Sequence, residues 1–348
     1  MAIIDKPSDY FETVLYTGNQ TARNITMDFA PNWVWIKKRT GASGTSNHYL
    51  LDSVRGANKV LYSNATNAEE TNTNSVTAFN SDGFSLGNDT DVNVNSGTFV
   101  SWNWKAGTSV SGNTGGSGTA KSYSGSVNTD AGFSIISYTG NFTNGQTTPH
   151  HLGAVPKMII VKNYANASES WNVYHESIGN TKYLVLNTTA AADTAPRWNN
   201  TSPTSTVFTN GANGATNANN ETIIAYCFAE KQGYSKFGSY VGSNSGAYGP
   251  FIYTGFKPAF VLIKDSSAAN AWTIRDDKRN TYNPATNFLV PDSNAAEVTL
   301  GEAVDILSNG FKIKANGGKV QDSGNTYIYM AFAENPFVSS TGVPATAR

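Results

Sequence analysis

The stretch "PNWVWIKKR" at residues 31–39 places tryptophans at alternate positions between a leading proline and a basic end. The same plan returns in "PKMIIVKNY" at residues 156–164 and in "PAFVLIKDS" at residues 258–266. Each copy reaches a lysine six positions after its proline, at Lys37, Lys162 and Lys264. Because a plan that recurs at an interval of roughly 100 residues is typical of a repeated structural unit, we predict one module used three times.

Three further landmarks keep their places relative to these prolines. A ring follows the proline by 73, 72 and 74 positions, at Trp104, Phe228 and Phe332. A turn precedes the proline, with "YTGN" at Tyr16, "YTGN" at Tyr138 and "YTGF" at Tyr253. A segment between the landmarks begins with a ring each time, at His48, Trp171 and Trp272. This agreement favours a common fold in the three modules.

Short runs in which apolar and polar residues alternate dominate every module, as in "FETVLYTGN" and "TFVSWNW". Such runs, bounded by Gly, Asn, Asp or Pro, are typical of strands. In "NWVWIKK", Trp33 and Trp35 face one side. Val34 and Ile36 face the other, and the runs "KMIIVK" and "AFVLIK" are apolar on both faces, as expected of a covered central strand. We therefore predict an all-β fold of three tandem antiparallel β-sandwich modules, jelly-roll-like in type.

The module boundaries follow from changes in composition. We predict a first module with a short N-terminal docking segment over residues 1–106, a second over 128–235, and a third with a C-terminal tail over 236–348. The stretch "AGTSVSGNTGGSGTAKSYSGS" at residues 106–126 is rich in Gly and Ser, and we predict a flexible linker over residues 107–127. The short, ring-bearing junction "EKQGYSKFGSY" predicts that the second and third modules pack as a pair.

The composition disfavours several classes of partner. Only 14% of residues are charged, the formal net charge is −1, and the basic run is limited to "KKR", whereas nucleic-acid binding requires a concentrated positive surface. No run approaches the roughly 18 apolar residues of a membrane helix, and "MAIIDKPSDYF" lacks the features of a signal peptide. We expect a soluble protein made in the cytoplasm. Cys227, in the apolar run "IIAYCFAE", is expected to be a core residue.

Two segments superficially suggest a metal site. His150 and His151 form a doublet in "TTPHHLGAVP", but neighbouring strand positions face opposite ways and no further ligands accompany them. Asp89 and Asp91 alternate with polar residues in "GNDTDVNVNSG", where an EF-hand would place glycine at the position of Val94. We expect an acidic hairpin here and no bound metal or cofactor.

The candidate catalytic groups do not form a recognisable constellation. His175 and Glu176 follow a strand in the second module. The corresponding positions hold other pairs, Asp52 with Ser53 and Asp276 with Asp277. Paired carboxylates of a glycosidase must lie across a cleft, and these acids are merely adjacent in sequence. A nucleophile elbow and a phosphate-binding loop are missing from the sequence, so we predict that the protein is not an enzyme.

Aromatic residues outside the expected strands are the candidate binding residues. They are Trp198 in "APRWNN", Tyr248 in "GAYGP" and Tyr282 in "NTYNP". Exposed rings on a rigid scaffold are suitable for stacking on sugars and for anchoring protein contacts. We predict that these three rings are exposed and take part in binding.

Three long stretches of the sequence are distinctive. They are "VNTDAGFSIISYTGN", "YCFAEKQGYSKFGSYVGSNSGAYGPFIYTGFKPAFVLIK" and "MAFAENPFVSSTGVPATAR". They resemble a family of tailed-phage virion proteins that is frequent in phages of marine bacteria and cyanobacteria and is labelled tail-fibre-like or structural. The resemblance extends from about Tyr10 to Arg348. It implies a virion component and supplies no catalytic residues.

The expected function follows from that resemblance. It is a phage tail or tail-fibre protein that takes part in virion assembly and host-surface contact. Its expected partners are tail, collar or capsid proteins, a host cell-surface glycan or protein, and further copies of itself, with a trimer as one arrangement. A head decoration or head-fibre protein is the alternative. A glycan-degrading tailspike is a third hypothesis, but the sequence shows neither a long β-helix repeat nor a carboxylate-lined groove.

Overall fold

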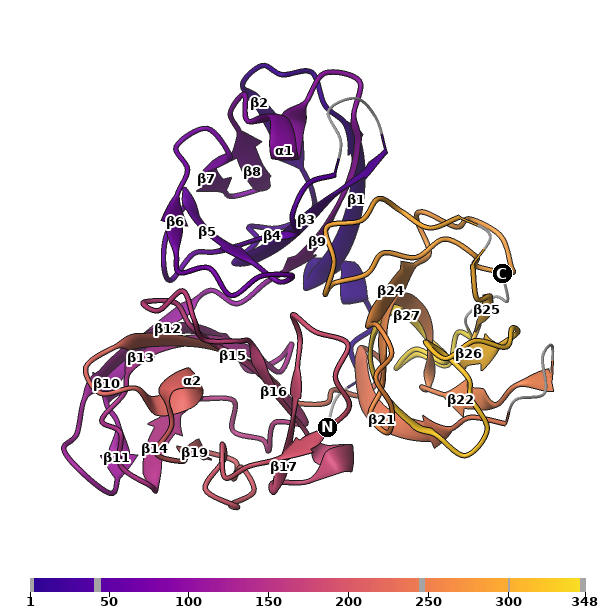
Figure 1. Cartoon of the computed structure of the whole chain (residues 1–348). Coiled ribbons are helices and arrows are strands. Elements are labelled where there is room, and N and C mark those ends of the chain that lie inside the picture. The colour runs from indigo at the N-terminus through magenta and orange to yellow at the C-terminus, as the bar shows by residue number, and fades with distance from the viewer. Residues whose placement is uncertain (1–2, 41–44, 244–247, 300, 345–348) are drawn as a thin grey trace.

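The computed structural model describes residues 3–40, 45–243, 248–299 and 301–344. Figure 1 shows three lobes around a common centre, each made of a larger sheet turned inward and a smaller sheet outside it. All the strand pairs within the named sheets are antiparallel. The predicted all-β fold of three tandem antiparallel β-sandwich modules is confirmed.

Module 1 runs from η1 to β9. Its elements are η1 (Pro7–Asp9), β1 (Phe11–Thr17), β2 (Arg23–Thr26), β3 (Trp33–Thr40), β4 (Tyr49–Asp52), β5 (Lys59–Tyr62), β6 (Glu70–Thr71), β7 (Val76–Asn80), β8 (Gly83–Leu86), α1 (Thr90–Asn93) and β9 (Thr98–Trp104). The strands form a six-stranded sheet, β1-β9-β3-β4-β5-β6, and a three-stranded sheet, β2-β8-β7. Between the sheets lies a core that includes Ile25, Val34 and Phe84.

Module 2 runs from β10 to β20. Its elements are β10 (Thr108–Asn113), β11 (Gly115–Gly116), β12 (Ser122–Asn128), β13 (Phe133–Thr139), β14 (Gln146–Pro149), β15 (Met158–Asn163), β16 (Asn172–His175), η2 (Glu176–Ile178), β17 (Lys182–Val185), β18 (Asp193–Thr194), β19 (Val207–Asn210), α2 (Gly214–Asn217) and β20 (Thr222–Phe228). The strands form an eight-stranded sheet, β10-β12-β13-β20-β15-β16-β17-β18, and a three-stranded sheet, β11-β14-β19. Its own core includes Ile136, Ile159 and Phe208.

Module 3 runs from β21 to β27. Its elements are β21 (Ser235–Val241), β22 (Phe251–Tyr253), β23 (Phe256–Asp265), β24 (Thr273–Asp276), β25 (Val304–Leu307), β26 (Gly310–Ile313) and β27 (Thr326–Pro336). The strands form a four-stranded sheet, β21-β27-β23-β24, and a three-stranded sheet, β22-β26-β25. Its own core includes Ile252, Val261 and Phe311.

Four inner strands follow one order in every module. The orders are β1-β9-β3-β4, β13-β20-β15-β16 and β21-β27-β23-β24. The register also recurs, because the second residue after each proline faces the ring landmark. These pairs are Trp33 with Trp104, Met158 with Phe228, and Phe260 with Phe332. The equal distances in the sequence are therefore the distances that this strand pairing requires.

Both faces of each proline-led strand are buried. On β3, Trp33 and Trp35 enter an apolar core that all three modules share, whereas Val34 and Ile36 enter the core of module 1 alone. The strands β15 and β23 divide their side chains in the same way. The prediction of a central strand covered on both sides is confirmed. Because successive strand residues point to opposite faces, one strand contributes to two cores.

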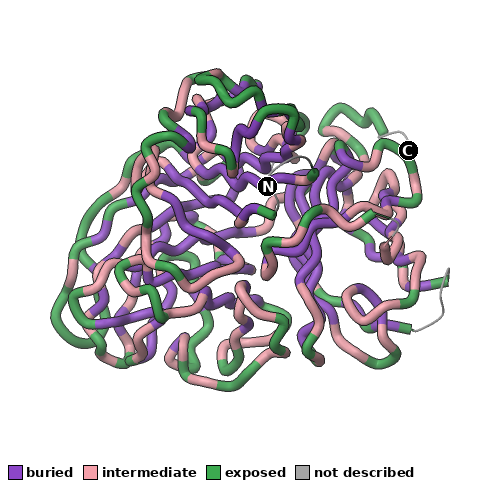
Figure 2. The backbone as a smooth tube through the Cα atoms, turned by 45° about the horizontal axis from the view of Figure 1, so that its top comes forward, coloured by how far each residue is buried: buried purple, intermediate pink, exposed green. Residues whose placement is uncertain are grey.

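Rings from all three modules meet in the shared core, where buried strands face one another and exposed loops lie outside (Figure 2). Trp33 stacks on Tyr226 of module 2 with ring centroids 4.4 Å apart. Phe11 stacks on Phe332 of module 3 at 5.2 Å, and Phe332 meets Phe228 of module 2 at 6.0 Å. Modules 2 and 3 therefore pack against each other, as predicted, and module 1 packs against both of them.

Residues 107–127 do not form the predicted linker. They contain β10, β11 and most of β12. β10 and β12 extend the larger sheet of module 2, and β11 extends the smaller one. The glycines permit close packing here. A Cβ atom at Gly112 would lie 2.8 Å from the Tyr123 hydroxyl, and one at Gly125 would lie 2.4 Å from the carbonyl oxygen of Ile135. A composition typical of a flexible chain is used for close strand pairing.

The "YTGF" turn of the third module is not the counterpart of the two "YTGN" turns. Tyr16, Tyr138 and Tyr240 occupy the same position on β1, β13 and β21. Each donates its hydroxyl to a backbone carbonyl of a later segment in its own module. These bonds join Tyr16 to Val92 at 2.8 Å, Tyr138 to Thr216 at 2.7 Å, and Tyr240 to Val320 at 2.7 Å. Tyr253 instead lies on β22, at the edge of the outer sheet. The three four-residue sequences are similar, but Tyr253 lies on a different strand of its module from Tyr16 and Tyr138.

Residues 3–10, within the expected docking segment, pack on the chain itself. The Ile4 amide donates to the carbonyl of Gln232 at 3.2 Å, between modules 2 and 3. The Asp5 carboxylate accepts the Ser340 amide at 2.7 Å. The two described ends of the chain therefore meet at one junction. Within the described ranges, no helix has the length and apolar character needed to cross a bilayer.

Candidate functional site

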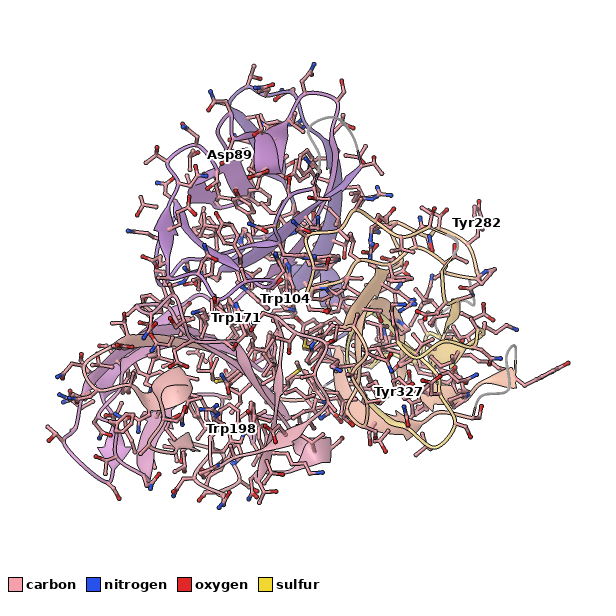
Figure 3. All side chains as sticks on the ribbon, in the orientation of Figure 1. Asp89, Trp104, Trp171, Trp198, Tyr282 and Tyr327 are labelled. Carbon is pink, nitrogen blue, oxygen red and sulfur yellow. The ribbon has the colours of Figure 1, made fainter. Side chains whose placement is uncertain are left out.

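Two of the three rings predicted as contact residues are exposed. Tyr248 is 83% exposed, and Tyr282 is 82% exposed at the outer edge of module 3 (Figure 3). Trp198 is 1% exposed, so the prediction of an exposed ring is wrong there. Its indole nitrogen donates to the Lys182 carbonyl at 3.0 Å, and its ring packs edge-on against Tyr174. The residues around Trp198 do form a loop, but the ring closes the core of module 2.

The acidic segment after β8 forms the one-turn helix α1 in place of the predicted hairpin. The Asp89 side chain accepts the Asp91 amide at 2.6 Å and caps this helix, a common role for aspartate. Asp91 accepts hydroxyl donors from Ser46 at 2.8 Å and from Tyr49 at 3.0 Å. In the part of the chain that the structure describes, no three His, Cys, Asp or Glu residues are grouped as metal ligands.

The two histidines of the doublet form local hydrogen bonds, and the cysteine packs in a core. Nδ1 of the buried His150 accepts the Leu152 amide at 3.2 Å, and burial lowers the pKa of His150 to about 4. The ring of His151 lies 2.9 Å from the Tyr123 hydroxyl. Cys227 is buried in the core of module 2, as expected, and burial raises the pKa of its thiol.

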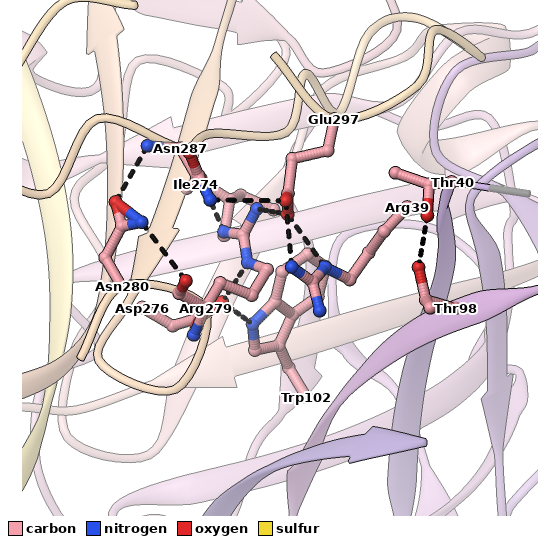
Figure 4. A network of polar contacts seen from close by, with 10 residues as sticks. All are labelled: Arg39, Thr40, Thr98, Trp102, Ile274, Asp276, Arg279, Asn280, Asn287 and Glu297. Carbon is pink, nitrogen blue, oxygen red and sulfur yellow. Dashed lines mark hydrogen bonds and ion pairs between the residues drawn. The ribbon is translucent and has the colours of Figure 1, made fainter. Parts of the chain in front are cut away.

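A buried ionic network joins modules 3 and 1 (Figure 4). Arg279 pairs with Asp276 at 2.6 Å and with Glu297 at 2.9 Å. Glu297 also pairs with Arg39 of module 1 at 2.9 Å. The indole nitrogen of Trp102, again from module 1, donates to Asp276 at 3.0 Å. Each buried charge meets an opposite charge, which offsets the cost of removing it from water.

The interface between modules 1 and 2 has the corresponding network. Asp52 pairs with Arg55 at 2.6 Å, and Arg55 pairs with Glu69 at 3.2 Å. The hydroxyl of Tyr226, from module 2, donates to Asp52 at 2.8 Å. Asp52 and Asp276 therefore lie in the interior and join neighbouring modules. Glu176, also considered as a catalytic candidate, is instead 53% exposed in its side chain and pairs with Lys157 of its own module.

The interface between modules 2 and 3 holds neutral side chains at these positions. The corresponding residues are His175 for the acid, Ile178 for the arginine, Ala192 for the glutamate and Met330 for the donor ring. Nε2 of His175 donates to the Tyr329 carbonyl at 3.2 Å, because its Nδ1 accepts a backbone amide. Burial lowers the pKa of His175 to about 4.

Backbone contacts place all three interfaces in register. At each interface an amide of one module donates to the residue eight positions after the proline of the next. These bonds join Glu69 to Tyr164 at 2.8 Å, Ala192 to Ser266 at 3.0 Å, and Glu297 to Arg39 at 3.1 Å. The modules therefore follow one another in a closed cycle.

The three lysines of the repeat are buried beside these contacts. The Lys37 ammonium donates to the Asn294 carbonyl of module 3 at 3.0 Å, and the Lys264 ammonium donates to the Thr189 carbonyl of module 2 at 3.0 Å. Lys162 donates to carbonyls within its own module. Burial lowers the pKa of each lysine to about 8. Their recurrence in the sequence reflects the shared architecture.

Exposed apolar side chains gather on module 3 and its tail. Among the described residues they are Val241, Tyr248, Phe251, Tyr253, Tyr282, Val338 and Val343 there, against Leu15, Phe142 and Val155 elsewhere. Phe251 and Tyr253 point outward from β22, whereas Ile252 between them is buried. An excess of exposed apolar groups on one module makes that module a candidate for contact with a partner. Module 3 is therefore the candidate contact surface.

A hollow of about 440 Å³ opens beside Tyr253, where module 2 joins module 3. Glu230, Lys231 and Lys236 contribute to its wall, and Glu230 pairs with Lys236 at 2.7 Å. Sequence reasoning missed Tyr253 because "YTGF" was matched with buried tyrosines. The alternation in "FIY", which puts two rings on one face of an edge strand, is the signal that identifies it.

A family model described as "Domain of unknown function (DUF7483)" matches residues 6–336. The matched range includes all three modules, so the family is defined by the complete body and not by one module. No curated protein and no solved structure match the chain.

Proposed function

The chain belongs to the DUF7483 family, and we propose that it is a structural protein of a phage particle, in the tail or a tail fibre. In this role it takes part in virion assembly and in contact with the host surface. The setting rests on the resemblance of its long sequence phrases to tailed-phage virion proteins. The mode of action is adhesion and not turnover.

One observation carries the proposal of an adhesion role. In the interior, the modules are connected by two ionic networks and, at the equivalent place of the third interface, by a buried histidine. On the surface, most of the exposed aromatic residues lie on module 3. The molecule therefore combines a rigid body with a contact surface on one of its three modules. Rigid elements that present exposed aromatic residues are well suited to recognition.

The expected partners are other virion proteins, a host-surface molecule and further copies of the chain. The aromatic residues on the inner faces of the three modules are already buried against one another within one chain. They are therefore not accessible to another copy of the protein. Further copies must therefore associate through outer surfaces. The proposed homo-oligomer can be tested by measuring the mass of the purified protein in solution.

The location on the particle tests the proposed setting. Gold-labelled antibody against the protein, viewed on intact phage particles by electron microscopy, should mark the tail or its fibres. Label confined to capsid faces would overturn the tail assignment and favour the head-decoration alternative. Absence of the protein from purified particles would overturn the virion role itself.

A separate assay tests the proposed mode of action. Purified protein incubated with capsular or surface polysaccharide of the host should leave the chain length of that polysaccharide unchanged. Release of oligosaccharides, measured by size-exclusion chromatography, would contradict adhesion without turnover and revive the glycan-degrading tailspike hypothesis.

A further inference from the structure

We propose that the hollow beside Tyr253 binds a saccharide, with the Tyr253 ring stacked on one face of a pyranose unit. The inference rests on the proposed host-surface contact and assigns it a site. The hollow measures about 440 Å³, within the roughly 300–1,000 Å³ that is typical of small-molecule sites.

The Tyr253 ring lies beside the backbone at Gly255. The side chain is 58% exposed, and it lies over Gly255, where an added Cβ atom would be 3.6 Å from the tyrosine oxygen and 3.8 Å from two ring carbons. Gly255 has φ of +81°, a conformation that glycine adopts without strain. The ring thus rests against a backbone that carries no side chain. An aromatic face supported in this way can pack against the C–H groups of a sugar at a small cost in side-chain entropy.

The fold does not require a ring at this position. Tyr253 pairs with Gly310 on the neighbouring strand, and Thr26 of module 1 pairs with Gly83 in the same register. The corresponding residue of module 2 is Pro149. Module 1 forms the same outer sheet with threonine here, and module 2 pairs the corresponding strand with proline here. The ring of module 3 is therefore not needed for this strand pairing.

Polar groups around the ring suit the hydroxyls of a sugar. The Glu230 carboxylate and the Lys236 ammonium lie 2.7 Å apart, with 31% and 36% of their side chains exposed. A sugar hydroxyl both donates and accepts hydrogen bonds, so an acceptor and a donor side by side can bind adjacent hydroxyls. Charged partners make these hydrogen bonds stronger than neutral ones.

The charge of the hollow favours an acidic sugar over a neutral one. Lys231 also lines it and has no ion pair among the described residues. The three charged side chains Glu230, Lys231 and Lys236 carry a net charge of +1. A carboxylate on the bound saccharide would be attracted to Lys231, and added salt should weaken this attraction.

Titration of the intact chain with two defined probes tests the site. Alginate hexamer supplies uronate rings and isomaltohexaose supplies neutral glucose rings, and binding is followed by saturation-transfer difference NMR. Alginate should bind, more tightly than isomaltohexaose. Tyr253→Ala should weaken binding by about tenfold through the loss of stacking, whereas Tyr253→Phe, which keeps the ring, should stay within about threefold of the original protein.

Phe142→Ala is the control, because Phe142 is an exposed ring of module 2 and lies outside both the hollow and the contact surface of module 3. It should leave binding unchanged, and unaltered thermal unfolding should show that all variants fold. Binding of neither probe, or binding that Tyr253→Ala leaves intact, would overturn the site. Either result is independent of where the protein lies on the particle, so it can be told apart from failure of the virion role.

Discussion

The interface of modules 3 and 1 and the interface of modules 2 and 3 occupy equivalent places around the shared core, yet they are stabilised differently. The first contains Asp276, Arg279 and Glu297 in a buried ionic network. The second has His175 and Ile178 at the equivalent positions of the first two. The backbone contacts are the same at both, so the geometry of the cycle does not depend on the ions.

The comparison teaches that the buried charges occur as a complete set. The donor ring Trp102 is replaced by Met330 at the neutral interface, where the side chain has no N–H or O–H to offer an acid. An aspartate placed beside Met330 without an arginine would be a buried, unpaired charge, which is strongly destabilising. Acid, arginine, glutamate and donor ring therefore have to change together.

The largest expected effect comes from breaking the ionic set. Arg279→Met should lower the free energy of unfolding by about 3–5 kcal/mol, because Asp276 loses its buried cation and Glu297 keeps only Arg39. Ile178→Met, at the equivalent place of the neutral interface, should cost less than about 1.5 kcal/mol as a hydrophobic exchange of similar volume. Urea unfolding measures the free energy lost by each variant. Equal losses would show that the ionic interface does not depend on its arginine more than the neutral interface depends on its isoleucine.

A transplant tests whether the set acts as one unit. The triple variant Asp276→His, Arg279→Ile, Glu297→Ala gives the interface of modules 3 and 1 three residues of its neutral counterpart. Its loss of unfolding free energy should be smaller than the sum of the three single losses by at least about 1 kcal/mol, because neighbouring groups in one network do not add independently. Simple addition of the single losses in urea unfolding would argue against a cooperative set.

Acid should affect the neutral interface through His175. The pKa of His175 is lowered by burial to about 4, whereas an unfolded histidine titrates near 6.5. The unfolded state therefore binds more protons between pH 4 and 6.5, and stability falls as the pH is lowered through this window. His175→Gln should remove up to about 3 kcal/mol of that pH dependence. An unchanged slope of unfolding free energy against pH would show that His175 makes no contribution.

An effect no larger than that of His175 should come from the lysines that recur in all three modules. Burial lowers the pKa of Lys37, Lys162 and Lys264 to about 8. The folded state loses these protons before the unfolded state does, so stability should rise between pH 8 and about 10. Replacing any one lysine by methionine should flatten this rise by up to about 3 kcal/mol, as for His175. If the pH dependence of the unfolding free energy differed strongly among the three variants, the lysines would not have the same role in the three modules.

The sequence predicts the modules well because strand alternation and repeat spacing are local properties. Trp33 and Val34 could be assigned to opposite faces of one strand, and the structure confirms this. The shared core was not predictable, since alternation shows that both faces are apolar without showing which neighbour covers each. The exposed ring was missed for a related reason. Tyr253 and the buried Tyr240 differ in strand position, and the letters around them do not show the difference.

The hydrogen bond between the Asp5 carboxylate and the Ser340 amide has a consequence for protein engineering. Asp5 and Ser340 lie close enough for a short peptide to connect the chain at this place, and circular permutation is generally tolerated when new ends are placed in exposed connections. A permuted gene that starts at residue 107 and links the original ends would translate module 2 first and module 1 last. Each module would still contact the same two modules, because the three modules form a closed cycle in which any module can come first in the chain.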